Sequence, residues 1–390
     1  MDKTRDILIR KMLSDNGLGA LFLWRSDELV MATGYQPLWG ISVCLYPVIG
    51  IPIIYVPELE PKDILPDGFK IKTFPWGRLD YINPWDILYE TIKEDLIKLR
   101  INNQPVTFLQ HSSHSAPCQM SAESAPLPFD FQKRIKYLSK GGYKDFMVEI
   151  LQLYTIKTSE EISKISLTNQ VASIGIKAFY ANLTPGKTEA EVACAVESAV
   201  QSQIGKAGVI YAKSWPLIMS GINSAYGGTF NRTTGKVLQS DELVLIEMAV
   251  CVNGYWCDIS RTGSIGTISK KQQAICDIVK TAQEIGFQAI KPGVKASTID
   301  RIVREYIDNM GYSKYFQHAL GHHVGFRYHD PGQGLSPESE LVIAEGMVLT
   351  VEPGIYALEF GGGSRIEDNV LVTLNGIKIL SEDSSELNDF

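Results

Sequence analysis

Histidine side chains gather in one short stretch of the C-terminal third of the chain. Four of the six histidines fall within the twelve residues HALGHHVGFRYH, at positions 318, 322, 323 and 329. Imidazole ionises near neutral pH and is the commonest metal ligand. We take His322 as the best imidazole ligand. His318 and His329 are candidates for the same site, although either could simply be solvated or hydrogen-bonded, and for His323 we expect that structural role.

Carboxylates occur in four apolar segments, where an acid is unusual. A carboxylate within a buried strand is costly unless it is paired or bound to a metal. Any one of these acids alone would be interpreted as a strand-edge residue, but together with the histidines they form a stronger pattern. The four are Glu247 in LVLIEMAV, Asp258 in YWCDIS, Glu352 in TVEPGIY and Glu367 in SRIEDN.

Oxygen and nitrogen ligands without a thiolate are typical of a hydrolytic metal site rather than a structural one. Four carboxylates and one imidazole suit two divalent metal ions that share bridging carboxylates. Two such ions about 3.5–4 Å apart can clamp a water molecule and stabilise the charge of its attack.

Two hairpins are expected to position the acids. Residues 243–263 read as two strands joined at Asn253-Gly254, the strongest short hairpin signal. Residues 347–373 read as a second hairpin that turns at the glycines 361–363. Each of the four strands would carry one acid among apolar neighbours.

The C-terminal region also contains an internal repeat. LTPGKTEAEV is echoed by IKPGVKASTIDRI, with Pro185 and Pro292 lying 107 positions apart. Each copy predicts a helix, a Pro-Gly turn and a second helix that starts from a capping box, Thr188 with Glu191 and Ser297 with Asp300. The acids repeat at similar offsets, 105 from Glu247 to Glu352 and 109 from Asp258 to Glu367. Although Pro-Gly turns are common, this agreement favours duplication, so each half would supply two acids to a site on a pseudo-twofold axis.

The N-terminal part alternates helical and strand-like segments, which is typical of an α/β domain with a mixed sheet. A boundary is predicted near residues 153–165, where Thr158 or Ser159 caps a helix. We therefore expect an N-terminal domain at 1–155 and a C-terminal domain at 156–390. The expected elements are helices at 4–15 and 85–100, and strands at 18–24, across 41–56 and near 106–110.

Composition excludes several classes of protein. A net charge of −7 and an isoelectric point near 5.5 argue against a nucleic-acid-binding surface. The uncharged run at 41–56 is too short to span a membrane and contains two prolines, so paired strands are expected there. Six cysteines without a CxxC pair, and an N-terminus without a signal peptide's apolar core, indicate a reduced cytoplasmic protein.

These segments resemble the pita-bread metalloenzymes, which include prolidase, aminopeptidase P, methionine aminopeptidase and the metal-free relative creatinase. HALGHHVGFRYHDPG, GMVLTVEPGIY and SRIEDNVLVT carry the resemblance, which covers about residues 156–380. The N-terminal part resembles the smaller creatinase-type domain. The resemblance implies a C-terminal pita-bread fold of two pseudo-symmetric halves.

The resemblance also implies roles for individual residues. The metal ligands become Glu247, Asp258, His322, Glu352 and Glu367, and Glu352 would also act on the attacking water. His318 and His329 would contact the substrate or the tetrahedral intermediate, and Arg365 would orient the region of Glu367. The cofactors would be two divalent ions of manganese, cobalt or zinc.

Two positions depart from the family pattern. The first ligand is usually aspartate, whereas this chain has Glu247, whose extra methylene must be absorbed by its rotamer or by a displaced metal. The segment SGINSAYGG resembles one that reaches a histidine five residues after its asparagine, but here Asn223 is followed at that spacing by Gly228. Losing one transition-state donor can cost about 10²–10³ in turnover. The residues that could compensate are Tyr226, Thr229 and Asn231.

The leading hypothesis is a two-metal hydrolase of a peptide or amide bond, with Xaa-Pro peptides the first choice of substrate and a homodimer the expected assembly. An alternative is a hydrolase of a small non-peptide amide or amidine, which the change at Gly228 favours. A metal-free, creatinase-like mechanism fits less well because the ligands are retained and the histidine base is missing. A non-catalytic binding module on the same fold is a third alternative, separable by metal content.

Overall fold

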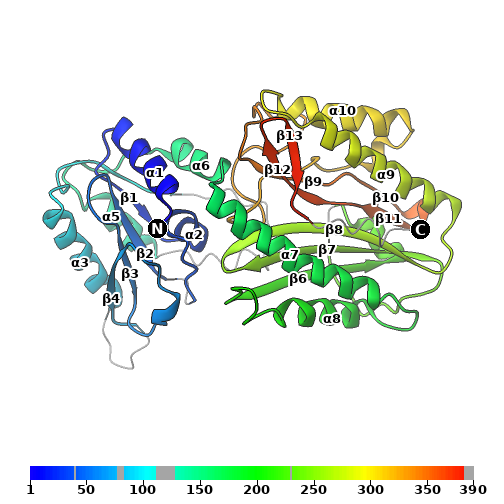
Figure 1. The fold of residues 1–390 in the computed structure, drawn as a ribbon, viewed down its shortest axis with the longest axis horizontal. Coiled ribbons are helices and arrows are strands. Elements are labelled where there is room, and N and C mark those ends of the chain that lie inside the picture. The colour runs from blue at the N-terminus through cyan, green and yellow to red at the C-terminus, as the bar shows by residue number, and fades with distance from the viewer. Residues whose placement is uncertain (39–40, 77–82, 111–127, 229–230, 382–390) are drawn as a thin grey trace. The chain divides into compact units, whose positions relative to one another are not determined.

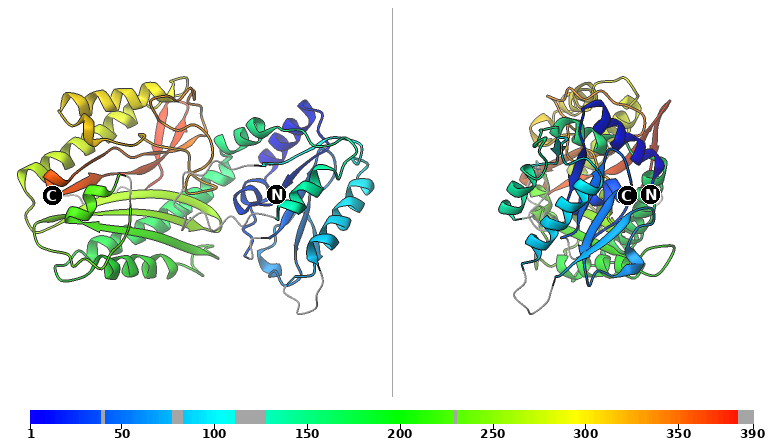
Figure 2. Two further views of the ribbon diagram at one scale, coloured as in Figure 1. Left: turned by 180° about the vertical axis from the view of Figure 1, so that it is seen from behind. Right: turned by 90° about the vertical axis from the view of Figure 1, so that its left-hand side faces the viewer.

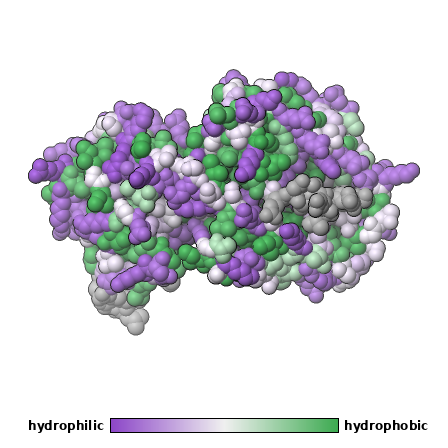
Figure 3. Space-filling view, viewed as in Figure 1, coloured by the Kyte–Doolittle hydropathy of each residue, from purple (hydrophilic) through white to green (hydrophobic). Residues whose placement is uncertain are grey.

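The computed structural model describes residues 1–38, 41–76, 83–110, 128–228 and 231–381. The chain forms two compact units, Met1–Tyr154 and Thr155–Phe390, shown as ribbons in Figures 1 and 2. Within the described residues no helix is both long and apolar enough to cross a membrane. On the visible face of each unit in Figure 3, hydrophilic and hydrophobic residues are intermixed.

The N-terminal unit is built on a five-stranded mixed sheet of order β4-β3-β2-β1-β5. The uncharged run at 41–56 forms two antiparallel strands of this sheet, as predicted, because Val43 to Leu45 pair with Tyr55 to Ile53. The strand expected near 106–110 is limited to two residues. The strands are β1 Ala20–Leu23, β2 Val43–Pro47, β3 Ile53–Pro57, β4 Lys70–Phe74 and β5 Val106–Thr107; the helices are α1 Lys3–Asp15, α2 Ser26–Thr33, η1 Lys62–Ile64, α3 Pro84–Lys98, α5 Phe129–Lys136 and α6 Met147–Thr155.

The first half of the C-terminal unit places two helices against a three-stranded antiparallel sheet of order β6-β7-β8. Asn253 and Gly254 have φ of 52° and 88°, so they form the tight turn that the Asn-Gly pair predicts. Thr158 caps α7 and forms a capping box with Glu161. The elements are α7 Ser159–Ala181, α8 Glu189–Gln201, β6 Ala212–Ser220, η2 Gly221–Tyr226, β7 Glu242–Val252 and β8 Tyr255–Ile265.

The second half repeats the two helices, but its long hairpin is interrupted. Strand β9 pairs with β12 and strand β10 pairs with β11, and each arm of the hairpin has a short break between its two strands. The elements are α9 Lys270–Ala289, α10 Ala296–Asn309, η3 Ser313–Tyr315, β9 Val348–Val351, β10 Gly354–Ala357, η4 Leu358–Phe360, β11 Gly362–Arg365, β12 Asp368–Thr373 and β13 Gly376–Ile379.

Equivalent backbone contacts tie the start of the second helix to an extended segment in each half. Thr188 forms a β-bridge with Val237, and Lys295 forms one with Val342. The amide of Glu189 donates to Lys236 O at 3.0 Å, and that of Ala296 to Leu341 O at 2.8 Å. The offsets of 107 and 105 residues between these contacts match the sequence repeat and support the duplication.

The two helix starts differ in their side-chain caps. Thr188 and Glu191 form the predicted capping box. The predicted box of Ser297 and Asp300 was wrong, because α10 begins two residues earlier than a cap at Ser297 requires and its cap residue, Lys295, has no side-chain oxygen to accept from the helix. The buried Asp300 instead accepts from Arg304 and from the amide of Leu320.

Helices lie on the outside of the C-terminal unit and its strands run between them (Figure 1). One apolar core packs α7 and α8 against the β6–β8 sheet, and a second packs α9 and α10 against the strands of the other half. The polar residues that follow project from the facing strands of the two halves, which meet at a bridge between Ser260 and Glu367.

Candidate metal centre and active site

The first two acids lie on neighbouring strands of the Asn-Gly hairpin. The register of β7 and β8 places Glu247 opposite Ser260 and Asp258 opposite Ala249. Because side chains alternate between the faces of a strand, Asp258 and Ser260 share a face with Glu247. Glu247 is 3% exposed and Asp258 is 1% exposed, so both carboxylates are removed from water.

The other two acids lie where the second hairpin is interrupted. Glu352 falls between β9 and β10, and Glu367 falls between β11 and β12. The sequence predicts each of these acids inside a strand, whereas the structure places them at the breaks, where the backbone leaves the ladder and both side chains can point toward the first hairpin. Glu367 is fully buried.

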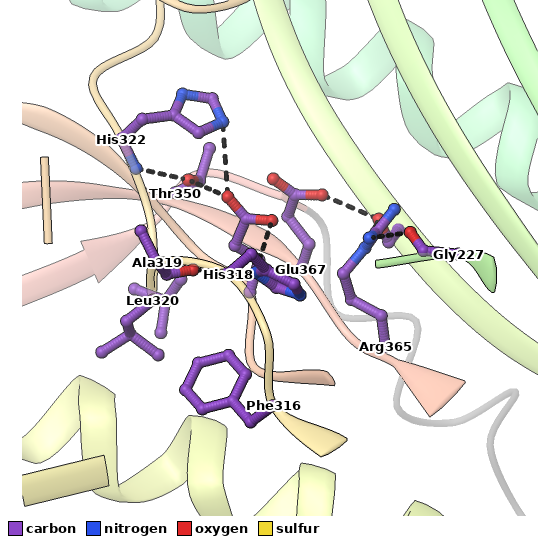
Figure 4. A network of polar contacts seen from close by, with 12 residues as sticks. Gly227, Phe316, His318, Ala319, Leu320, His322, Thr350, Arg365 and Glu367 are labelled. Atoms are coloured by element: carbon purple, nitrogen blue, oxygen red, sulfur yellow. Dashed lines mark hydrogen bonds and ion pairs between the residues drawn. The ribbon is translucent and has the colours of Figure 1, made fainter. Parts of the chain in front are cut away.

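His322 joins the acids from the segment before β9. Its Nδ1 donates to the carbonyl oxygen of His323 at 2.9 Å, which leaves Nε2 as an electron-pair donor. Nε2 lies 3.4 Å from Asp258 Oδ2 and 3.4 Å from Glu352 Oε1. In the view of Figure 4, Glu367 lies between His322 and Arg365.

The five residues predicted as metal ligands therefore converge. Three sets of ligand atoms lie within 4.8 Å of one another: Glu247, Asp258 and Glu367; His322, Glu352 and Glu367; and Asp258, His322 and His329. The first two sets share Glu367, which is the arrangement that two neighbouring ions with a common carboxylate need. The first set offers only oxygen, and the second mixes oxygen with one imidazole.

Two buried oxygen atoms show that the centre fits a cation. Asp258 Oδ1 and Glu367 Oε1 are buried and have no hydrogen-bond partner among the described residues. Burial and the neighbouring carboxylates raise the pKa of Asp258 and of Glu367 well above the usual range. A bound divalent cation would supply the missing partner and favour the ionised form of both acids.

Glu247 is held differently from the other acids. Its Oε2 accepts from Arg365 Nη2 at 2.5 Å and from the Ser260 hydroxyl, and its Oε1 accepts from the Tyr328 hydroxyl. Burial would raise the pKa of Glu247, but Arg365 and these hydroxyl donors outweigh it and the pKa is lowered. Glu247 is thus ionised even where its neighbours hold protons.

Ser260 connects the two sets of ligands. Its Oγ lies 2.7 Å from Glu367 Oε2, contacts Glu247 and accepts from Arg365 Nε at 2.8 Å. One hydroxyl proton cannot serve two ionised carboxylates. Without a cation, a proton on Glu367 satisfies the arrangement, in keeping with the raised pKa of that acid.

A chain of hydrogen bonds runs from Arg365 to His318 through Tyr356. Arg365 Nη1 donates to the Tyr356 hydroxyl at 3.0 Å, and that hydroxyl lies 2.9 Å from His318 Nε2. His318 Nδ1 donates to Ala319 O at 2.8 Å, so Nε2 accepts from Tyr356. Burial lowers the pKa of His318 despite the opposing effect of Glu352, which keeps the imidazole neutral.

His329 lies beside His322. The two rings are 3.6 Å apart, and His329 Nε2 is 3.8 Å from Asp258 Oδ2. Burial, and then the charges of His322, Arg327 and Arg365, lower its pKa well below the usual value. His323 belongs to none of the three ligand sets; it is buried with a pKa lowered to about 3, so it is neutral.

The space beside Gly228 is filled by Tyr356. A Cβ atom at residue 228 would lie 2.8 Å from Cδ2 and 2.9 Å from Cε2 of the Tyr356 ring, closer than real Cβ contacts. Of the three residues considered as compensating donors, Tyr226 is 50% exposed and Asn231 has a buried Oδ1 without a partner among the described residues. Thr229 lies outside the described residues.

Comparison with known proteins agrees with this geometry. Residues 163–374 match the model of metallopeptidase family M24. The chain is 39% identical to the Xaa-Pro dipeptidase of Pyrococcus furiosus over 377 residues, which are 97% of each chain. The chain belongs to metallopeptidase family M24.

Solved structures of relatives show the same M24 architecture. A prolidase from Pyrococcus furiosus is 30% identical with a TM-score of 0.76, and the match covers 96% of this chain and 99% of that one. A Xaa-Pro dipeptidase from Bacillus anthracis, at 24% identity and a TM-score of 0.80 over 97% of both chains, supports the fold. The prediction of a pita-bread fold with a smaller N-terminal α/β domain is confirmed.

Three polar residues of this M24 centre were not anticipated from the sequence: Ser260, Tyr328 and Tyr356. Ser260 could have been found, since a two-residue turn at Asn253-Gly254 fixes the register that sets it opposite Glu247. Tyr328 and Tyr356 carry no such signal, because an aromatic residue beside a histidine or a strand end is usually a core residue.

Proposed function

We propose that this M24 protein is a metal-dependent Xaa-Pro dipeptidase. The observation that carries the proposal is the convergence of Glu247, Asp258, His322, Glu352 and Glu367 into two ligand sets that share an acid. The relative that is 39% identical over 97% of both chains is named a Xaa-Pro dipeptidase. This name supports dipeptides, and not longer peptides, as the proposed substrates of this chain.

The proposed ligands divide between the two sets. Glu247 and Asp258 would hold one ion, His322 and Glu352 the other, and Glu367 both. When bound, divalent ions polarise the substrate carbonyl and lower the pKa of water. The oxygen-rich sets suit manganese, while the imidazole also accepts cobalt or zinc, and we propose these three as the candidate metals.

Glu352 is the proposed proton carrier. Its Oε1 lies 3.4 Å from His322 Nε2 and its Oε2 lies 3.9 Å from His318 Nδ1. Its carboxylate is partly exposed, unlike the other three acids, so it can reach both a water molecule and the leaving amine. It would take a proton from the attacking water and pass it to the proline nitrogen.

Neighbouring residues would position the substrate. His318 is neutral and lies against Tyr356, and His329 lies beside His322, so both imidazoles border the space where the scissile bond must sit. We propose that His318 and His329 contact the substrate and that Arg365 orients the acids through its bonds to Glu247 and Ser260.

Location and assembly are also proposals. Five cysteines of the described residues are unpaired, which supports a reducing, cytoplasmic location. We propose that the protein is a homodimer. We also propose that each chain has an N-terminal domain of residues 1–155 and a catalytic domain of residues 156–390. Sedimentation of the purified protein would test the dimer.

The test of the function uses substrates and metal content together. Protein loaded with manganese, cobalt or zinc is dialysed, analysed for metal, and assayed on an Xaa-Pro dipeptide, an Xaa-Pro-Yaa tripeptide and small amides. We expect two ions per chain and highest kcat/KM on the dipeptide. A preference for the tripeptide would indicate an aminopeptidase. A preference for small amides would support the alternative that Gly228 suggests. Less than one bound ion per chain with every metal would favour a non-catalytic binding module.

A further inference from the structure

Tyr328 is a buried aromatic residue whose hydroxyl reaches an acid of the proposed metal centre. It is 5% exposed and its ring stacks on His329, with the centroids 4.4 Å apart. A buried phenol needs a hydrogen-bond partner, and here the partner is Glu247 Oε1. The side chain thus packs against His329 and donates to Glu247.

The two oxygens of Glu247 are held in different ways. Oε2 is fixed by two donors, Arg365 and Ser260, and both belong to strands that frame the centre. Oε1 accepts from the Tyr328 hydroxyl. Rotation of the carboxylate about its last bond would move both oxygens, so Tyr328 opposes it together with Arg365 and Ser260.

The length of Glu247 is what allows this contact. Asp258 and Glu367 form a ligand set with Glu247, and both have an oxygen without a partner among the described residues, whereas the oxygens of Glu247 are bonded by protein donors. The Glu247 side chain has one more rotatable bond than an aspartate. It therefore needs a restraint, which a shorter side chain would not need, to hold its carboxylate toward Asp258 and Glu367. Tyr328 provides that restraint at Oε1 and Ser260 provides it at Oε2.

We propose that Tyr328 is a positioning residue that, with Ser260, aims the Glu247 carboxylate at one of the two metal positions and sets its affinity. The proposal rests on the two-metal centre of the proposed function. The Tyr328 hydroxyl bonds to Glu247, whereas its ring centroid lies 6.2 Å from that of the His322 ring, a contact that a phenylalanine would keep. Its effect should therefore be confined to the ion held by Glu247, Asp258 and Glu367.

The test measures metal affinity in solution. Metal-free wild type and Tyr328→Phe are titrated with Mn²⁺ by calorimetry, and free Mn²⁺ is followed by electron paramagnetic resonance. Phenylalanine keeps the ring stacked on His329 and removes only the hydroxyl. A hydrogen bond to a charged group corresponds to about a tenfold change in affinity or more, so we expect one of the two Mn²⁺ affinities to fall by about that factor and the other to stay within twofold.

Controls assign the affected position. His322→Ala should weaken the other Mn²⁺ affinity, which identifies the one that Tyr328 controls. Tyr312→Phe is the matched control, since Tyr312 packs in an aromatic cluster with Tyr315 and Phe360 and should change neither affinity. Equal weakening of both ions by Tyr328→Phe, or no weakening, would overturn the proposal.

A double-mutant cycle gives the sharper test. Glu247→Asp keeps the charge but withdraws the carboxylate from Tyr328, so it should weaken the same Mn²⁺ position, and Tyr328→Phe should then have no further effect. An undiminished effect of Tyr328→Phe in the Glu247→Asp protein would show that the hydroxyl acts elsewhere. If Tyr328→Phe does not fold, Glu247→Asp alone carries the test, and equal or tighter Mn²⁺ binding by it would contradict the proposal.

The outcomes also separate this inference from the function on which it rests. The wild-type protein could bind two Mn²⁺ ions and cleave Xaa-Pro dipeptides while Tyr328→Phe leaves both Mn²⁺ affinities unchanged. That result would remove only the role of Tyr328. A wild-type protein that binds fewer than two ions would remove the two-metal centre and the role of Tyr328 together.

Discussion

At the scale of single residues, pairing decides what each acid of the centre can do. Glu247 is ionised by its bond to Arg365, whereas Asp258 and Glu367 have raised pKa values and unpartnered oxygens. Glu352 differs from all three because its carboxylate is partly exposed. Glu247 is therefore held by protein donors, and Asp258 and Glu367 have oxygens that a cation can bind. Glu352 is accessible for proton transfer.

Glu352 provides the most direct residue-scale prediction. Glu352→Gln keeps the size of the side chain and removes its ability to take a proton, so kcat on an Xaa-Pro dipeptide should fall by about 100-fold or more under saturating metal. The matched control is Glu340→Gln, an exposed acid that pairs with Lys295. Turnover that survives Glu352→Gln would remove the proposed proton carrier.

Gly228 provides a second residue-scale prediction. Because a Cβ at residue 228 would strike the Tyr356 ring, Gly228→Ala should displace the hydroxyl that joins His318 to Arg365 and lower kcat/KM. Gly235→Ala is the control, since nothing lies within 4 Å of a Cβ there. For the same reason Gly228→His should not raise activity. A large gain from Gly228→His would show that the missing imidazole, and not the occupied space, limits the enzyme.

At the scale of elements, the sequence predicted best where local chemistry fixes geometry. Asn253-Gly254 set the turn and register of the first hairpin, and the Thr188 box set the start of α8. The breaks at Glu352 and Glu367 could not be predicted, because the amides of these two residues donate to the carbonyl oxygens of Leu320 and Ser260, which are distant in sequence. The second capping box failed because the cap position holds a lysine.

The segment that carries His329 and Tyr328 is held by a buried ion pair. Lys157 Nζ lies 2.8 Å from Asp330 Oδ2 with both side chains fully buried, and Asp330 Oδ1 accepts from the amides of Phe326 and Arg327. This pair links the start of the C-terminal unit to the histidine segment. It is the element-scale counterpart of the contacts around Glu247.

Breaking that pair should destabilise the C-terminal unit. Lys157→Met leaves Asp330 as an unpaired buried charge, and the free energy of unfolding should fall by about 3–5 kcal/mol in a urea titration. Lys164→Met is the matched control, because Lys164 forms an exposed pair with Glu160 that should contribute less than about 1 kcal/mol. An equal loss in the two variants would contradict the assigned role of the buried pair.

At the scale of the whole molecule, the acids of the centre couple folding to pH and to metal. The folded-state pKa values of Asp258 and Glu367 are raised, so their protons are bound more tightly in the folded protein than in the unfolded chain. The stability of the metal-free protein should then fall as pH rises from about 4, the unfolded value, through the raised folded values. Glu247, with its lowered pKa, contributes in the opposite sense and only at the acidic end.

Metal binding should reverse this loss, which gives the last prediction. A divalent ion binds the deprotonated acids, so the rise in Tm on adding Mn²⁺ should be larger at pH 8 than at pH 5. At 100 times the dissociation constant the ion stabilises the fold by about 2.7 kcal/mol, roughly 5–10 °C for a unit of this size. Glu367→Gln, which removes the acid shared by both ligand sets, should abolish most of the rise and flatten the metal-free pH profile, while Glu340→Gln should change neither. Calorimetry at the two pH values measures all of these, and a rise that is independent of pH or that persists in Glu367→Gln would place the metal away from these acids.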